Sequence, residues 1–154
     1  MKTLFLFHLG ACLCVRGVAL AQSVGPPFPE PGRWEMRVSL RGAPVKDPAL
    51  STVCLRAQDL GDVPERAFLE AAVRSLPQES KGEPQCKLTE VLRDDEKSSW
   101  QARCNGPRGP MHGAGKAVLS PQAATVEQGF GVDTPFGRQT LTQTIRARRL
   151  GNCP

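Results

Sequence analysis

The clearest pattern in the chain is a strict alternation of apolar and polar side chains in residues 34–40. The alternating residues are, in order, Trp34, Glu35, Met36, Arg37, Val38, Ser39 and Leu40. Successive side chains of a β-strand point to opposite faces, so the alternation predicts a half-buried antiparallel strand. Apolar content and flanking turn residues predict further strands at residues 52–56, 86–92, 98–104, 112–119, 124–130 and 138–148.

One helix is predicted between these strands. Pro64 suits its first turn, where a missing amide proton costs no hydrogen bond, and Pro77 ends it. The apolar side chains at helical spacing between them are Phe68, Leu69, Ala72, Val73 and Leu76. The predicted fold class is therefore mainly β with one inserted helix: an antiparallel curved sheet, a sandwich or an open barrel of about seven strands.

The N-terminal segment has the organisation of a secretory signal peptide. Lys2 precedes an apolar stretch, and Ala19-Leu20-Ala21 provides a cleavage site that would leave Gln22 first. Arg16 interrupts the stretch and would be costly in a retained transmembrane helix, which favours removal. Lipid attachment at Cys12 is a minor alternative. Residues 1–21 are thus a predicted signal peptide, residues 22–33 a Pro/Gly-rich leader, and residues 34–154 a single domain.

Charge and composition narrow the function classes. Cleavage would remove two basic residues and no acid, which lowers the formal net charge from +5 to +3. No clustered basic face of the kind that nucleic-acid-binding proteins carry is evident, so no nucleic-acid partner is predicted. The remaining cysteines are Cys54, Cys86, Cys104 and Cys153. Their wide spacing does not fit a zinc site, and in an exported chain it predicts disulfides formed in an oxidising compartment.

The order of several landmarks resembles one protein family. The landmarks are Pro31-Gly32-Arg33-Trp34-Glu35-Met36, Cys54-Leu55, Cys86-Lys87-Leu88-Thr89, Trp100, Cys104-Asn105-Gly106, Met111, Gly113, Gly115 and Leu150-Gly151-Asn152-Cys153. Together they resemble the bacterial domain-of-unknown-function 3617 family of exported proteins of Gram-negative bacteria, over roughly residues 31–153. The resemblance implies a periplasmic location, a β-rich fold and a disulfide role for the four cysteines, and it implies no activity.

The cysteine pairing has three possible solutions. Sequence proximity and the family-like layout favour Cys54–Cys86, which would close the loop that holds the helix, and Cys104–Cys153, which would tie the C-terminus to a strand. The chain also departs from the family habit of a methionine-, glycine- and threonine-rich C-terminal half, because Arg146, Arg148 and Arg149 lie near its end.

Candidate chemistry is sparse. His112 is the one histidine left after cleavage, and no Gly-x-Ser-x-Gly motif accompanies it. Asp94-Asp95-Glu96 lacks the alternating ligands of a calcium loop and is typical of a solvated hairpin tip. Trp34 and Trp100 sit in strand patterns and are expected to be core residues rather than ligand-stacking rings. No catalytic, cofactor-binding or metal-binding residue is therefore predicted.

The C-terminal arginines are the one surface with a possible binding role. On a strand, Arg146 and Arg148 would share a face with Thr140, Thr142 and Thr144. Guanidinium groups bind phosphate and carboxylate, so this face, with Arg149, is a possible site for anionic envelope components. We expect an exported periplasmic protein of unknown biochemical function, most consistent with a non-enzymatic binding or envelope-associated module, whose partner could also be another periplasmic protein. The alternative is a hydrolase with carboxylates that the sequence does not identify.

Overall fold

A computed structural model describes residues 28–42, 48–75, 85–106, 109–134 and 137–154. The predicted signal peptide, the proposed cleavage site, Cys12 and the first part of the leader lie outside these residues. Within them, Phe28 packs against the core and Pro29 is buried. The strand pattern begins at Gly32, slightly before the alternation in the sequence. The end of the leader therefore contributes to the packed structure.

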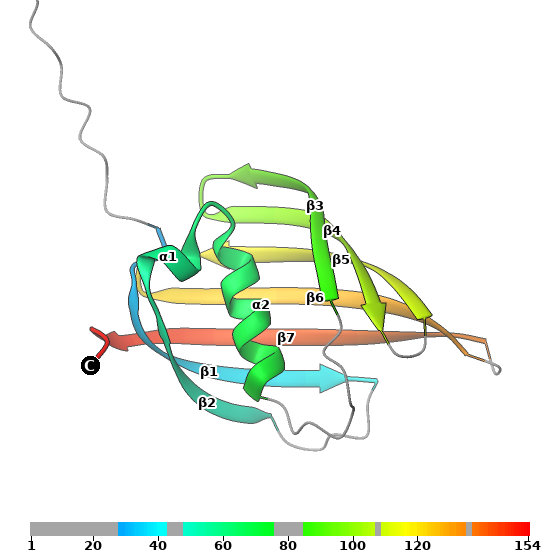
Figure 1. Ribbon diagram of the computed structural model, residues 1–154, viewed down its shortest axis with the longest axis horizontal. Coiled ribbons are helices and arrows are strands. Elements are labelled where there is room, and N and C mark those ends of the chain that lie inside the picture. The colour runs from blue at the N-terminus through cyan, green and yellow to red at the C-terminus, as the bar shows by residue number, and fades with distance from the viewer. Residues whose placement is uncertain (1–27, 43–47, 76–84, 107–108, 135–136) are drawn as a thin grey trace, which may run out of the picture.

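Seven antiparallel strands form one open sheet (Figure 1). They are β1 (Gly32–Arg41), β2 (Ala49–Leu55), β3 (Gln85–Asp94), β4 (Lys97–Gly106), β5 (Gly109–Leu119), β6 (Ala123–Thr134) and β7 (Gly137–Gly151). Their spatial order is β2-β1-β7-β6-β5-β4-β3, so β2 and β3 are the edges. The predicted fold class is confirmed, and of its alternatives the structure has the open sheet.

Two helices follow β2. The short helix α1 (Ala57–Leu60) was not predicted, because one turn carries no readable periodicity. Helix α2 (Pro64–Ser75) begins at the predicted proline and lies across one face of the sheet (Figure 1). We call this the helix face, and the opposite side of the sheet the outer face. The molecule thus has a helix layer on a sheet layer, with the core between them.

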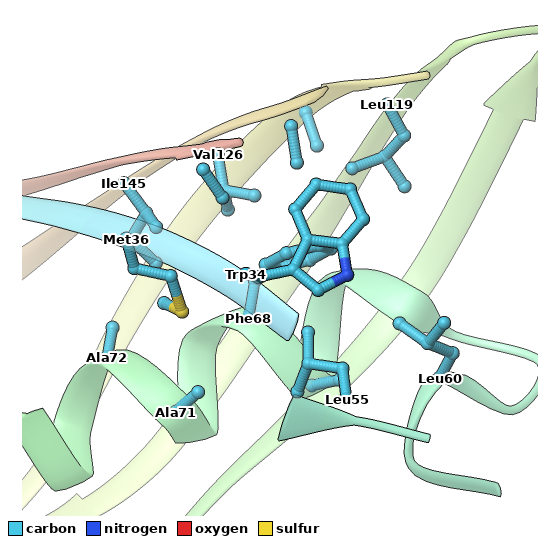
Figure 2. Packing of buried hydrophobic residues seen from close by; sticks show 14 of the residues in the cluster. Trp34, Met36, Leu55, Leu60, Phe68, Ala71, Ala72, Leu119, Val126 and Ile145 are labelled. Carbon is cyan, nitrogen blue, oxygen red and sulfur yellow. The ribbon is translucent and has the colours of Figure 1, made fainter. Parts of the chain in front are cut away.

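The core is built where β1 passes beneath α2. The Trp34 ring meets the Phe68 ring edge to face, with centroids 5.2 Å apart, and neither side chain is exposed. Figure 2 shows Met36, Val126 and Ile145 beside this pair, so β1, β6 and β7 all contribute to the same cluster. Trp100 is also buried on the helix face. Both tryptophans are therefore core residues, as predicted.

Close packing on β5 requires a glycine. The indole of Trp100 occupies the space where a side chain at Gly115 would begin. A Cβ atom there would overlap ring atoms of the indole, so the ring could not keep its position. The Gly115 backbone therefore forms part of the floor on which Trp100 packs.

A buried ion pair anchors the start of α2. The Glu65 carboxylate is fully buried and accepts two 2.8 Å hydrogen bonds from the Arg93 guanidinium and one from the Ser98 hydroxyl at 2.5 Å. Arg93 lies on β3 and Ser98 on β4. The contact joins the helix to the β3–β4 hairpin, and it satisfies a charge that would otherwise be costly to bury.

The four cysteines form two disulfides, as predicted, but the favoured pairing was wrong. The bonds are Cys54–Cys153 and Cys86–Cys104. Cys86 and Cys104 are register partners in the β3–β4 hairpin, with Cα atoms 4.0 Å apart. Near the opposite edge of the sheet, Arg33 of β1 pairs with Cys54 of β2 and with Gly151 of β7. This pairing brings the C-terminus close to β2. Strand pairing thus decides the connectivity, since it joins both the nearest pair of cysteines in sequence, Cys86 and Cys104, and the most distant pair, Cys54 and Cys153. Two disulfides indicate an oxidising environment.

Candidate functional site

A cavity of about 380 Å³ lies between α2 and the helix face of the sheet. Its lining residues are Arg66, Leu69, Glu70, Val73 and Arg74 from α2; Cys86 and Leu88 from β3; Met111 from β5; Gln128 and Phe130 from β6; and Gln143 from β7. The volume is within the range that small-molecule sites occupy in proteins. Most of the lining is apolar, so the cavity is suited to a ligand with a substantial apolar part.

Helix α2 lines the cavity with one of two neighbouring stripes. Pro64, Ala67, Phe68, Ala71 and Ala72 are buried against the core, and we call them the core stripe. Arg66, Leu69, Glu70, Val73 and Arg74 recur at spacings of three and four residues, and we call them the cavity stripe. On the cavity stripe, Leu69 and Val73 are half-buried whereas the three charged side chains are exposed. The apolar members therefore face inward, and the charges lie at the rim.

Two glutamines form the polar floor of the cavity. Gln128 and Gln143 are register partners on β6 and β7, and their side chains are only 2% and 8% exposed. The Oε1 atom of Gln128 is buried and has no hydrogen-bond partner among the described residues. A buried amide oxygen without a partner loses its hydration without compensation, which costs about 1–3 kcal/mol. A ligand that donates a hydrogen bond would remove this cost.

Apolar side chains from three strands complete the wall. Leu88 is buried, and Met111 and Phe130 are half-buried. The Phe130 ring packs over Gly113, where a Cβ atom would overlap the backbone of the neighbouring strand. Methionine adapts its shape to irregular ligands, and an aromatic ring offers a flat apolar surface. The site can bind an apolar group and can fix its orientation through the two amides.

The charged side chains of the cavity lining lie at the mouth of the cavity. Glu70 is the single carboxylate among the described lining residues. The buried carboxylate of α2, Glu65, is already occupied by Arg93 and Ser98. The described lining of the cavity therefore does not contain the pair of carboxylates that a hydrolase would use.

The remaining candidates from the sequence lie away from the cavity. His112 is exposed on β5, in register with Arg103 on β4. Asp94, Asp95 and Glu96 are exposed at the β3–β4 turn, in accordance with a solvated hairpin tip. Across the described ranges, no three potential ligands converge on a metal position. None of these residues joins the site.

The three C-terminal arginines do not act as one group. Arg146 is exposed on the outer face, and Arg148 on the same face pairs with Glu35 at 3.2 Å. Arg149 donates hydrogen bonds of 3.0 and 2.9 Å to the Pro31 carbonyl, and its side chain is 15% exposed. Arg149 therefore ties the leader to β7, while Arg146 is left on the open surface.

The glutamines of the floor carried a signal that the sequence reasoning did not use. In residues 124–130 and 141–147, every second side chain is apolar except Gln128 and Gln143. A polar residue at an apolar position of an alternating strand is buried on the core side, where it must find a partner. This break in the pattern, present in two strands, pointed to a polar site inside the fold.

Comparison with known proteins gives a family and no function. Searches of curated proteins and of solved structures found no match to this chain. Neither helix of the described chain is long and apolar enough to cross a membrane. A family model described as "Protein of unknown function (DUF3617)" matches residues 29–153, which include both disulfides, α2 and the cavity. The chain therefore belongs to the DUF3617 family, the family that its cysteine and tryptophan landmarks resemble.

Proposed function

We propose that this protein is an exported, non-enzymatic binding module that holds a small, mainly apolar ligand in the cavity beneath α2. The observation that carries the proposal is the buried pair Gln128 and Gln143 on the floor of a cavity whose walls are mainly apolar and whose charges lie at the rim. The ligand combines an apolar body with a hydrogen-bond donor for the Gln128 Oε1 atom. Its size is limited by a volume of about 380 Å³.

Export is supported by two independent features. The N-terminal residues have the organisation of a signal peptide with cleavage before Gln22, and the domain holds two disulfides. Both fit a periplasmic location. The intact mass of the exported protein checks this part of the proposal, since cleavage gives a chain that begins at Gln22. A lipid-modified Cys12 would contradict it.

A binding role is favoured over catalysis by the character of the lining. Amides and aliphatic side chains recognise a ligand, but they neither transfer protons readily nor act as nucleophiles. The disulfide at the wall withdraws Cys86 from thiol chemistry. The cavity therefore offers shape and hydrogen bonds.

The proposal can be tested with N-phenyl-1-naphthylamine, a fluorescent probe that has two apolar ring systems and one N–H donor. We expect saturable binding to the native, oxidised protein. Val73→Trp, which fills the cavity from α2, should abolish most of the binding. Ala114→Trp, which adds the same ring to an exposed position on the outer face, is the matched control and should bind normally.

Gln128→Leu separates recognition from stability. Loss of the acceptor should weaken probe binding about fivefold, because a hydrogen bond contributes about 1 kcal/mol. The same change removes an unpartnered buried oxygen and should raise the free energy of unfolding by about 1 kcal/mol.

One outcome would refute the cavity as the binding site. It is equal probe binding by the wild-type protein and the Val73→Trp variant, with both proteins shown to be folded by near-ultraviolet circular dichroism.

A further inference from the structure

The outer face carries one row of side chains that crosses all seven strands. Adjacent register partners, taken from β2 to β3, are Leu50, Arg37, Arg146, Thr125, Val118, Lys97 and Asp94. All seven side chains are exposed. We call this set the outer row. It lies on the opposite side of the sheet from the cavity, so it does not depend on the function proposed above.

Beside Leu50 in the outer row, two arginines face each other across the β1–β7 pairing. Arg37 is the register partner of Arg146, and neither has an ion-pair partner among the described residues. Like charges directly opposite on neighbouring strands repel each other and destabilise a sheet. The pair therefore carries an electrostatic cost that folding alone does not remove.

The nearby acids are already neutralised. Glu35, two residues before Arg37, binds Arg148 at 3.2 Å. Glu127, two residues after Thr125, binds Lys116 at 2.9 Å. Arg37 and Arg146 are thus left as two adjacent guanidinium groups with ten N–H donors between them. An external anion would relieve their repulsion and accept bidentate hydrogen bonds.

Exposed aliphatic side chains lie in and beside the same row. Leu50 is 64% exposed at one edge of the sheet, and Val118 is 46% exposed on β5. Leu92, 70% exposed, belongs to the adjacent row through its pairing with Ser99. Large aliphatic groups beside basic ones match the interface of a bilayer, where acyl chains meet phosphate groups. A polysaccharide would use the arginines but would leave the leucines in water.

We propose that the outer row docks on the surface of an anionic phospholipid bilayer, with Arg37 and Arg146 binding a lipid phosphate and Leu50 and Val118 inserting beside the head groups. This surface differs from the one that the sequence indicated. Arg148 and Arg149 are engaged within the protein, whereas Arg37, about 110 residues upstream of them, completes the site. The cavity and the outer row then face opposite ways.

The test is co-sedimentation of the oxidised protein with vesicles. We expect binding to vesicles that contain phosphatidylglycerol, little binding to pure phosphatidylcholine, and release at 1 M salt, where charge attraction is screened. Arg37→Ser/Arg146→Ser should lower the partition coefficient about 25-fold, since each basic residue at an anionic surface contributes about 1 kcal/mol and 1.4 kcal/mol is a factor of ten. Its thermal midpoint should be equal or slightly higher, because a repulsive pair is removed.

Lys87→Ser/Arg103→Ser is the matched control. These two residues are also register partners and exposed, but they lie about 20 Å along the strands from the outer row. The control removes the same charge and should retain binding within about threefold. Equal losses in the two double variants would show diffuse attraction and overturn the site. Arginine-dependent binding to polygalacturonate without binding to the vesicles would assign the pair to an acidic polysaccharide and would also overturn it.

Discussion

The two stripes of α2 meet the same sheet in different ways. The core stripe buries Phe68 against Trp34 and follows it with Ala71 and Ala72, so the helix comes close to β1 and β7 without a gap. The cavity stripe carries half-buried Leu69 and Val73 between exposed charges, and it lines the cavity, although Leu69 also packs against the core cluster. Neighbouring sides of one helix thus differ, because one packs into the core and the other lines the cavity.

This division has a physical advantage. Packing in a protein core is dense, so a cavity lowers stability by removing contacts and by leaving polar groups unsatisfied. The core stripe, the Glu65–Arg93 anchor and the Cys54–Cys153 disulfide, which fixes the neighbouring strand β2, hold α2 in place through residues outside the cavity lining. Residues of the cavity stripe can therefore change with modest loss of stability.

The largest expected changes in the free energy of unfolding come from removing the disulfides. One disulfide lies at the β2 side of the sheet and the other in the β3–β4 hairpin, so the two regions can be compared. Cys54–Cys153 spans 99 residues and fixes β2, which α2 contacts. Cys86–Cys104 spans 18 residues, and Cys86 lines the cavity. Chain entropy predicts that the Cys54→Ala/Cys153→Ala variant loses about 5 kcal/mol and the Cys86→Ala/Cys104→Ala variant about 3 kcal/mol. Urea unfolding measures both, and the reverse order would show that the cavity side controls stability.

The stripes themselves provide the next test. Phe68→Ala should lower the free energy of unfolding by about 4 kcal/mol, because it removes a fully buried ring from the core. Val73→Ala, on the half-buried cavity stripe, should cost less than about 1 kcal/mol. Chemical denaturation of the two variants under identical conditions gives the comparison. Similar losses would mean that the cavity stripe is as important to folding as the core stripe.

Breaking the Glu65–Arg93 ion pair at the start of α2 should have a smaller effect on the free energy of unfolding. Arg93→Ala leaves the Glu65 carboxylate buried with only Ser98 as a partner, and we expect a loss of about 2 kcal/mol, reduced by the 35% exposure of the Arg93 side chain. Arg74→Ala, an exposed position on the cavity stripe, should change stability by less than about 0.5 kcal/mol. Adding Glu65→Gln to Arg93→Ala should restore part of the loss. If it restores none, the contribution of Arg93 is packing rather than charge.

The sequence predicted the strands and the long helix because each depends on local information. The alternation in residues 34–40 indicates which side chains of β1 point toward the core, and Pro64 marks the start of α2. The Cys86–Cys104 bond could also have been predicted from the sequence. The predicted hairpin of residues 86–92 and 98–104 places its two ends opposite each other, and Cys86 and Cys104 are also the nearest of the four cysteines in sequence.

The cavity and the arginine pair could not be predicted in this way. Whether Val73 packs or lines a space depends on the distance between α2 and the sheet, which large residues elsewhere, such as Trp34 and Phe68, determine. Arg37 and Arg146 meet only because β7 inserts beside β1, a pairing between opposite ends of the chain. Strand order is a non-local property, and alternation within one strand does not contain it.

The position of β7 has a consequence for the order of folding. It is the last strand of the chain, yet it lies between β1 and β6. Strands β3 to β6 each pair with the strand that follows and can form hairpins as they emerge, whereas the β1–β2 hairpin has no neighbouring strand until β7 is complete. Contacts such as that of Glu35 with Arg148 span 113 residues, and long-range pairing of this kind slows folding. During synthesis from the N-terminus, the first hairpin to be made must therefore wait for β7 before it joins the sheet.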